Sequence, residues 1–233
     1  MTNDTVVIHK YKVIEKIGAG GFSSVYKAQH INNGKMVALK IVKLPEYAKV
    51  ICNESKIISY LNRELSVFDQ QFFPTLHWYG KFGNMTCLAT TYYTGSLQNV
   101  LSTTLDIKQK IDIGLQMISL VRCIHELFIV HCDIKPDNFM INDNSKLVLI
   151  DFGLARCYYD FNKREHVPNV KSHGIVGTFE YMSDYVKEGN RASRRDDVIS
   201  VCKIMEKIGV RVKQIVCEYA DVPEYDIIEE QEN

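Results

Sequence analysis

The sequence predicts an α+β fold with two lobes, a small β-rich lobe followed by a mainly helical one. Residues 11–43 read as three strands, and the Asn33-Gly34 pair between the last two accepts the positive φ angles of a tight hairpin turn. Apolar residues then recur at helical spacing, first over 46–62 and later up to about residue 128. Because no repeat, low-complexity tract or Pro/Gly linker interrupts the chain, we expect one domain with lobes at 1–92 and 93–233.

The small lobe is expected to contain a five-stranded sheet and one helix. Two further strands, at 75–82 and 85–93, follow the three strands of 11–43 and the helix of 46–62. One stripe of this helix is formed by Val50, Glu54, Ile57, Ile58 and Leu61. Since a carboxylate that faces a core is costly unless it is paired, Glu54 should meet a cation from the sheet.

The second lobe begins with a possible helix start at Gly95-Ser96. A long core helix ends near Phe128, and its predicted buried stripe consists of Ile111, Leu115, Ile118, Val121, Ile124 and Leu127. Short strands follow at 139–141 and 147–150, and then a loop with little periodicity over 156–178. Helices are predicted at 181–188, 196–208 and 211–220.

Composition excludes several classes of protein. The chain has 233 residues, of which 46% are hydrophobic and 24% charged, as in an ordinary globular domain. Its 28 basic residues balance its 28 acidic ones, which argues against general nucleic-acid binding or attachment to anionic membranes. Near the end, eight Lys and Arg over 187–213 precede seven Asp and Glu over 218–232, a pattern typical of a solvated acidic tail beside a basic face.

Neither a zinc site nor an export signal is expected. The seven cysteines form no Cys-x-x-Cys pair, and no histidines accompany them at zinc-finger spacing. The first residues are polar, and no run approaches the roughly 18 apolar residues of a membrane-spanning helix. We therefore expect a protein of the cytoplasm or nucleus.

Two short motifs in the small lobe suggest phosphate binding. The run GAGGFSSV at 18–25 lies where one strand turns into the next, and glycines there are often no more than a turn. The run VALK ends at Lys40, which alternates inward on its strand and supplies the cation that Glu54 requires. Such a pair holds nucleotide phosphates in one class of enzymes.

The most specific motif lies in the second lobe. The run HCDIKPDN at 131–138 is followed, thirteen residues after Asn138, by Asp151 of the DFG run at 151–153. This order and spacing match the catalytic loop and the metal loop of protein kinases. Chance agreement of all these motifs in order is negligible.

The chain accordingly resembles protein kinases over roughly residues 11–208, and the bilobal protein kinase fold is implied. The runs FPTLHWYG at 73–80 and SRRDD at 193–197, together with the missing Ala-Pro-Glu motif, are similar to the casein kinase I superfamily. The run GTFEY at 177–181 is similar to its vaccinia-related kinase relatives, so the branch stays open.

The resemblance implies which residues bind ATP and Mg²⁺. Lys40, fixed by Glu54, would bind the α- and β-phosphates. Asp133 would accept the proton of the substrate hydroxyl, Lys135 would stabilise charge on the transferred group, and Asn138 and Asp151 would hold Mg²⁺. The remaining ATP-binding residues would be Gly18, Ala19, Gly20, Gly21, Phe22 and Ser23 over the triphosphate, Ile17, Val25 and Ala38 above the adenine, Met140 below it, Thr90 as gatekeeper, and the main chain of Thr91, Tyr92 and Tyr93 at the hinge.

Three features depart from the family pattern. Ser23 stands where many kinases have a third glycine. Cys132 replaces the usual arginine before the catalytic aspartate, so a phosphorylated activation loop would lack its cationic anchor. The chain ends 25 residues after Ile208, so we expect an abbreviated second lobe.

The resemblance implies transfer of the ATP γ-phosphate to Ser or Thr of protein substrates, because Lys135 and Thr178 match Ser/Thr kinases. Relatives prefer acidic substrates, and Arg194, assisted by Lys171, is the candidate anion contact; alternatively Arg194 only braces the loop against the helix. The competing function is that of a pseudokinase, a regulatory protein-binding module that binds nucleotide weakly or not at all. The oligomeric state cannot be read from the sequence.

Overall fold

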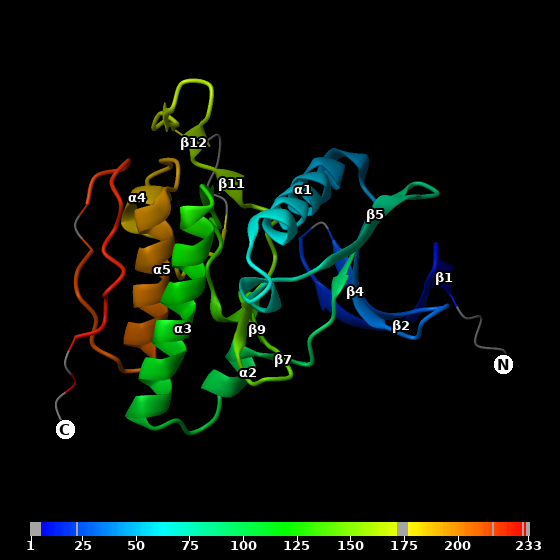
Figure 1. Ribbon diagram of the computed structural model, residues 1–233, viewed down its shortest axis with the longest axis horizontal. Coiled ribbons are helices and arrows are strands. Elements are labelled where there is room, and N and C mark those ends of the chain that lie inside the picture. The colour runs from blue at the N-terminus through cyan, green and yellow to red at the C-terminus, as the bar shows by residue number, and fades with distance from the viewer. Residues whose placement is uncertain (1–5, 22, 172–176, 216, 230, 232–233) are drawn as a thin grey trace. The chain divides into compact units, whose positions relative to one another are not determined.

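The computed structural model describes residues 6–21, 23–171, 177–215, 217–229 and 231. The chain divides into two compact units, the first ending at Thr94 and the second beginning at Gly95. The curled antiparallel sheet of the first unit and the helices of the second are those of an α+β kinase-like fold (Figure 1).

The first unit is built on an antiparallel sheet with the strand order β1-β2-β3-β4-β6-β5. Its strands are β1 (Val7–Ile8), β2 (Tyr11–Ala19), β3 (Ser24–His30), β4 (Met36–Val42), β5 (Leu76–Phe82) and β6 (Met85–Thr91). The sheet therefore has six strands rather than the five expected. The extra strand is short: Ile8 pairs with Tyr11 across a tight turn in which His9 has a φ of 54°.

One face of this sheet packs against α1 (Ala48–Glu64), which contacts β5 and β6 (Figure 1). Short 3₁₀ turns precede and follow it, η1 (Pro45–Tyr47) and η2 (Asp69–Phe72). The buried residues of α1 are Ile51, Glu54, Ser55, Ile58 and Leu61. Val50 and Ile57, predicted on the buried stripe, lie at its edges and are half-buried.

The other face of the sheet carries its own apolar core. Its buried members are Ile8, Tyr11, Ala28, Val37, Leu39, Ile41, Cys87 and Ala89. The N-terminal strand β1 thus contributes to the fold by covering apolar side chains of β4 and β6 that would otherwise meet water.

The second unit is mainly helical. Its helices are α2 (Leu97–Leu101), α3 (Ile107–Glu126), α4 (Asp184–Lys187) and α5 (Arg194–Lys207), with the 3₁₀ turn η3 (Pro136–Asn138). Its short strands are β7 (Gly95–Ser96), β8 (Ile129–Val130), β9 (Phe139–Ile141), β10 (Leu147–Leu149), β11 (Arg156–Cys157), β12 (Tyr159–Asp160) and β13 (Glu165–His166). They form the sheets β10-β9-β7, β11-β8 and β12-β13.

Three expectations for this unit were wrong. The segment predicted as a loop at 156–178 contains the short strands β11, β12 and β13. Residues 211–220 form no helix where the structure describes them, but an irregular segment with one β-bridge between Val212 and Ile228. Leu115 is 52% exposed, because the buried face of α3 is centred on Ile113, Met117 and neighbouring positions instead.

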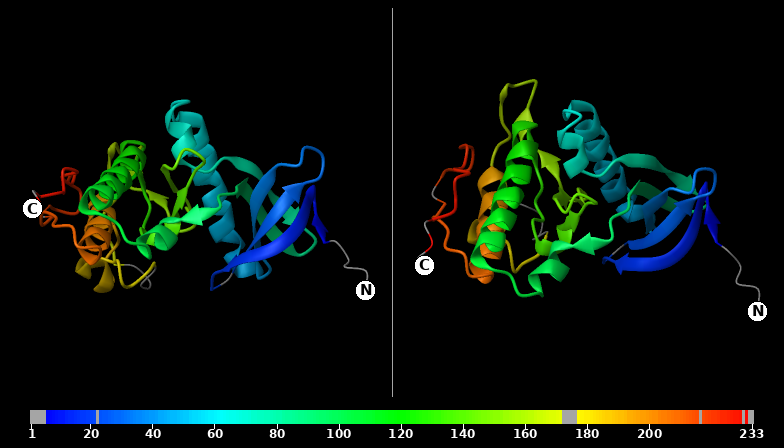
Figure 2. Two further views of the ribbon diagram at one scale, coloured as in Figure 1. Left: turned by 90° about the horizontal axis from the view of Figure 1, so that it is seen from below. Right: turned by 60° about the horizontal axis from the view of Figure 1, so that its bottom comes forward.

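Helices α3 and α5 lie side by side, as Figure 2 shows from two directions. Gly114 makes this close packing possible: a Cβ atom there would lie 2.7 Å from the sulfur of Met205 and 3.3 Å from the Cδ1 of Ile228. The same contact places Ile228 of the C-terminal segment, described at 210–215 and 217–229, against this helix pair. Within that segment Val210 and Ile227 are buried and act as its apolar anchors.

The C-terminal acidic residues are not simply a solvated tail. Lys213 Nζ lies 3.2 Å from Glu224 Oε1 and 3.0 Å from Asp226 Oδ2, and these carboxylates raise the lysine pKa. Exposed pairs of this kind stabilise little, because water and salt screen the charges. Burial of Ile227 therefore contributes more to the attachment of the segment than these ion pairs do.

Charge is divided between the two units although the whole chain is neutral. The first unit has 11 Lys and Arg against six Asp and Glu, and the second has 17 against 22, which gives formal charges of +5 and −5. All seven cysteines are free thiols. Among the described residues, no helix has the length and apolarity needed to cross a membrane.

Candidate active site

The first unit places Lys40 against Glu54, as the sequence predicted. Lys40 comes from the central strand β4 and Glu54 from the buried stripe of α1, and Nζ lies 2.8 Å from Oε2. The two side chains are only 13% and 6% exposed, so the pair is shielded from solvent. A buried carboxylate requires a cationic partner, and the ion pair in turn holds the Lys40 ammonium in one position.

Strand register gathers the other predicted nucleotide residues around Lys40. Val25 is directly opposite Lys40, and Thr90 is directly opposite Ala38. Since paired and alternate residues share a face of a sheet, Val25, Ala38, Lys40 and Thr90 all line one face. Gly18 pairs with Val25, which brings the glycine-rich turn to the same strands.

The glycine-rich turn connects β2 to β3. The N–H of Gly20 donates to the carbonyl of Ser23 at 2.9 Å, which closes the turn. Ile17 precedes it and is 44% exposed, Ala19 ends β2, and Gly21 is exposed. Phe22 lies outside the described residues, so its predicted contact with the triphosphate stays a prediction.

The predicted hinge is partly committed to internal hydrogen bonds. The N–H of Thr91 donates to the carbonyl of Thr75 at 3.2 Å, and the Thr75 N–H donates to the Thr91 hydroxyl at 3.1 Å. The N–H of Thr91 is therefore already engaged and is not free for an adenine contact. The Tyr93 hydroxyl reaches the Phe73 carbonyl at 3.4 Å, and Lys27 Nζ lies 5.0 Å from the centre of the Tyr92 ring.

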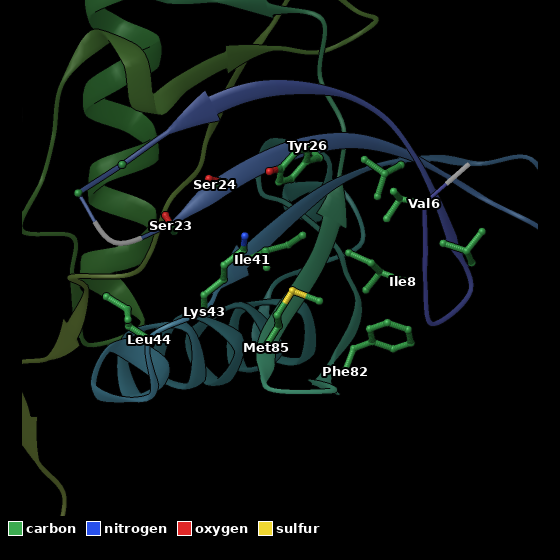
Figure 3. A pocket seen from close by; sticks show the side chains of 14 residues that line it. Val6, Ile8, Ser23, Ser24, Tyr26, Ile41, Lys43, Leu44, Phe82 and Met85 are labelled. Atoms are coloured by element: carbon green, nitrogen blue, oxygen red, sulfur yellow. The ribbon is translucent and has the colours of Figure 1, made fainter. Parts of the chain in front are cut away.

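A separate pocket of about 660 Å³ lies on the first unit's sheet, on the face opposite to the one that carries Lys40 (Figure 3). Ser24 and Ile41, which are directly paired, belong to it, as do Tyr26 and Met85. Because Ile41 is adjacent to Lys40 on β4, its side chain points to the other side of the sheet. This pocket, which the sequence did not indicate, is thus not the face that carries Lys40.

The second unit gathers three side chains, those of Thr178, Lys135 and Asn138, around Asp133. Its Oδ1 accepts the N–H and the hydroxyl of Thr178, both at 2.8 Å. Its Oδ2 lies 2.9 Å from Lys135 Nζ and 3.3 Å from Asn138 Nδ2. Lys135 also donates to the Thr178 hydroxyl at 2.9 Å. The carboxylate is thereby held in one orientation, with a cation and a hydroxyl beside it.

The predicted metal ligands are connected through the backbone. The Ile150 N–H donates to the Asn138 carbonyl at 2.9 Å, which ties the residue before Asp151 to η3. Asn138 directs its amide nitrogen to the Asp133 carbonyl at 2.8 Å, so its amide oxygen is the atom suited to a cation. Asp151 has a φ of 61°, and such left-handed non-glycine residues often occur at functional sites.

This donor set fits Mg²⁺ held jointly with phosphate oxygens. Mg²⁺ prefers oxygen ligands, and usually one or two protein groups complete a shell that phosphates and waters supply. One amide oxygen and one carboxylate, from Asn138 and Asp151, are such groups. No cluster of three or more His, Cys, Asp or Glu suited to a metal occurs in the described part of the chain.

A buried aspartate that the sequence did not identify as functional holds the catalytic loop. Asp197, near the start of α5, accepts the N–H of His131 at 2.7 Å and the N–H of Cys132 at 2.9 Å. The hydrogen bond from His125 and the contacts with His131 lower the pKa of Asp197 despite the opposing effect of burial. The only sequence signal for it is its position in the SRRDD run.

Cys132 is a packing residue with an inert thiol. Its φ is 68°, and burial raises its pKa to about 12, so the thiolate is scarce at neutral pH. His131 is fully buried, with Nε2 2.9 Å from the Ile150 carbonyl and its ring against Phe152. Both residues shape the loop on which Asp133 stands.

Gly177 brings Thr178 to Asp133. Its φ of 111° is one that side chains rarely allow, and a Cβ there would lie 2.8 Å from the Cys132 carbonyl. No other residue type fits both the conformation and the space. The glycine therefore explains how the loop after residue 176 approaches the catalytic loop so closely.

The remaining predicted residues have other surroundings. Met140 lies in β9 between Ser96 and Val148. Arg194 is 9% exposed, donates to the Ala220 carbonyl and stacks 4.5 Å from the centre of the Tyr158 ring. The bracing role considered for Arg194 thus agrees with its contacts, whereas an exposed anion site does not. Lys171 forms a bridge with Asn190.

A family model described as the protein kinase domain matches residues 11–218. The match includes both units, from β2 to the C-terminal segment. It covers every residue that the sequence analysis assigned to catalysis, nucleotide or metal.

Proposed function

Because the chain belongs to the protein kinase family, we propose that it is an active kinase that transfers the γ-phosphate of ATP to serine or threonine hydroxyls of proteins. The observation that supports this most directly is the arrangement around Asp133. Its carboxylate is oriented by Thr178 and Asn138 and lies beside the ammonium of Lys135. Phosphoryl transfer requires this kind of positioning and charge neutralisation rather than covalent catalysis.

Each residue has a distinct proposed task. Lys40, held by Glu54, binds phosphate oxygens of the nucleotide. Asp133 accepts the proton of the attacking hydroxyl and orients it for in-line attack. Lys135 neutralises charge that develops on the transferred group. Mg²⁺, when bound through Asn138 and Asp151, supplies further neutralisation of the phosphates.

The Ser/Thr preference rests on the link between Lys135 and Thr178. The lysine spans the carboxylate and the threonine hydroxyl, with Nζ 2.9 Å from each. This lysine and threonine resemble the corresponding residues of Ser/Thr kinases, and that resemblance supports the proposed preference over tyrosine. The casein kinase I-like branch is proposed on the SRRDD run, in which Ser193 and Asp196 form a capping box at the start of α5.

Acidic substrates are proposed to be favoured only weakly. Arg194 is occupied by Ala220 and Tyr158, so it offers little to a substrate phosphate or carboxylate. Exposed lysines contribute roughly 0 to 1 kcal/mol to such contacts, and salt reduces this further. A preference of about fivefold at most between acidic and neutral peptides is expected.

The test compares two substitutions in the same loop. Asp133→Asn removes the proton acceptor, whereas Asp137→Asn makes the same change four residues later at an exposed position. With radiolabelled ATP and casein as substrate, the first variant should lose about 10²- to 10⁴-fold in turnover, and the second should match wild type. A nucleotide-induced thermal shift, measured with Mg²⁺ and ATP, should be similar for all three proteins.

Three results would overturn the proposal. Equal turnover by wild type and Asp133→Asn would show that the observed phosphate transfer does not depend on this site. A thermal shift without any turnover by wild type would identify a nucleotide-binding pseudokinase. If wild type showed neither a thermal shift nor turnover, the regulatory protein-binding function would replace the proposed one.

A further inference from the structure

A chain of hydrogen bonds connects the C-terminal segment to the catalytic loop. The Tyr225 hydroxyl lies 2.8 Å from His125 Nδ1, and His125 Nε2 lies 3.0 Å from Asp197 Oδ2. Asp197 in turn accepts the N–H groups of His131 and Cys132. Asp133 is the next residue after these two. Tyr225 thus lies at one end of a series of hydrogen bonds whose other end is the backbone immediately before Asp133.

The chemistry of the groups fixes the direction of these bonds. Asp197 has a lowered pKa and acts as acceptor, so the Nε2 of His125 carries its proton toward it. Burial lowers the pKa of His125, which favours the neutral ring with Nδ1 as acceptor. Tyr225 must then donate its hydroxyl hydrogen to Nδ1. A tyrosine in this place therefore selects the histidine tautomer that can serve Asp197.

We propose that Tyr225 is a positioning residue, which acts through His125 and Asp197 to hold the backbone of the catalytic loop and so to place Asp133. Its effect on turnover rests on the proposed kinase function, whereas its effect on the loop backbone does not. Neither the nucleotide nor the protein substrate touches it in this scheme.

Several contacts attach the segment around Tyr225 and so hold its hydroxyl beside His125. The start of α5 donates three hydrogen bonds to its carbonyls: Ser193 to Tyr219, Arg194 to Ala220, and Arg195 to Cys217. Ile227, two residues after Tyr225, is 1% exposed. The guanidinium of Arg122 lies 5.7 Å from the centre of the Tyr225 ring and steadies it from α3.

The chain offers a matched control for the decisive substitution. Tyr225→Phe removes the hydroxyl that donates to His125 and keeps the ring. Tyr219→Phe makes the same change in the same segment, but the Tyr219 hydroxyl is buried without a hydrogen-bond partner among the described residues. The Ser193 contact to residue 219 uses the backbone carbonyl and is unaffected.

We expect Tyr225→Phe to lower kcat about tenfold with an unchanged KM for ATP, because one buried hydrogen bond of the loop support is lost. Amide hydrogen exchange at His131 and Cys132 should accelerate by a similar factor, while amides in the middle of α3 keep their protection. Tyr219→Phe should change neither measurement. Equal behaviour of the two variants would overturn the proposal.

A double-mutant cycle tests whether the effect passes through His125. Once His125→Gln has removed the acceptor, adding Tyr225→Phe should produce little further acceleration of exchange. Additive effects would mean that Tyr225 acts by another route and would contradict the inference. If wild type showed no phosphate transfer at all, the kinase function would fail, but the exchange measurements would still decide the role of Tyr225.

Discussion

Three residues near the catalytic loop have backbone conformations that side chains rarely adopt. Cys132 and Asp151 have φ angles of 68° and 61°, and Gly177 has one of 111°. Left-handed residues other than glycine cost roughly 1 to 2 kcal/mol each, so the surrounding hydrogen bonds must hold them. Asp197 does this for Cys132 by accepting its N–H.

Substitution of Gly177 should therefore impair the site more than the fold. In Gly177→Ala the added Cβ must move away from the Cys132 carbonyl, and this displaces Thr178 from Asp133. We expect at least a tenfold loss of turnover, in addition to a conformational cost of about 1 kcal/mol.

Gly189→Ala is the matched control, because Gly189 also has a positive φ, 84°, but open space where the Cβ would be. It should show a similar loss of stability in urea and full turnover. Equal turnover losses in both variants would mean that backbone strain, rather than the contact with the catalytic loop, explains the effect.

The elements were predictable where their patterns are local. Strand alternation and the Asn33-Gly34 turn predicted β2, β3 and β4, and the isolated charge of Glu54 predicted its pairing with Lys40. The helix predicted at 211–220 was wrong: where the structure describes these residues they form an irregular segment, in which Val212 pairs with Ile228 in a β-bridge instead of continuing a helical stripe.

Contacts between residues far apart in the sequence could not be predicted from local sequence patterns. Asp197 is 64 residues from Asp133 in sequence, and only the packing of α5 shows that it serves the catalytic loop. The same holds for Tyr225 and His125, which are 100 residues apart. Sequence motifs identified the residues around Asp133, whereas the residues that hold them in place could be identified only from the fold.

The N-terminal cap of α3 should contribute measurably to the stability of the protein. Asp106 accepts the N–H of Gln109 at 2.8 Å, and the Gln109 side chain accepts the N–H of Asp106 at 2.9 Å, a reciprocal capping box. Asp106→Ala should lower the free energy of unfolding by about 1 kcal/mol. Urea denaturation of this variant, of Gln109→Ala and of the double variant would measure the coupling, and strict additivity would contradict the box.

At the scale of the whole molecule, buried histidines make stability depend on pH. Burial lowers the pKa of His77, His125 and His166. Below the unfolded value of about 6.5 the unfolded chain binds more protons than the folded one, so acid favours unfolding. Above that value these groups are neutral in both states and contribute no slope.

The urea midpoint should accordingly fall as the pH is lowered from 7 to 5. The slope is at most about 1.4 kcal/mol per pH unit for each histidine that stays neutral in the folded state. His77→Gln should make the dependence shallower without touching Asp133 or Lys40. A midpoint that stays constant or rises toward pH 5 would contradict this account.

The opposite charges of the two units also affect how the chain meets charged surfaces. Formal charges of +5 and −5 cancel in the total but not at distances of about a Debye length, roughly 10 Å at 0.1 M salt. An anionic surface attracts the first unit and repels the second, and a cationic surface does the reverse. Although its net formal charge is zero, the chain therefore responds to charged surfaces. The sign of the surface charge determines which unit makes contact, and it is the same unit in every adsorbed molecule.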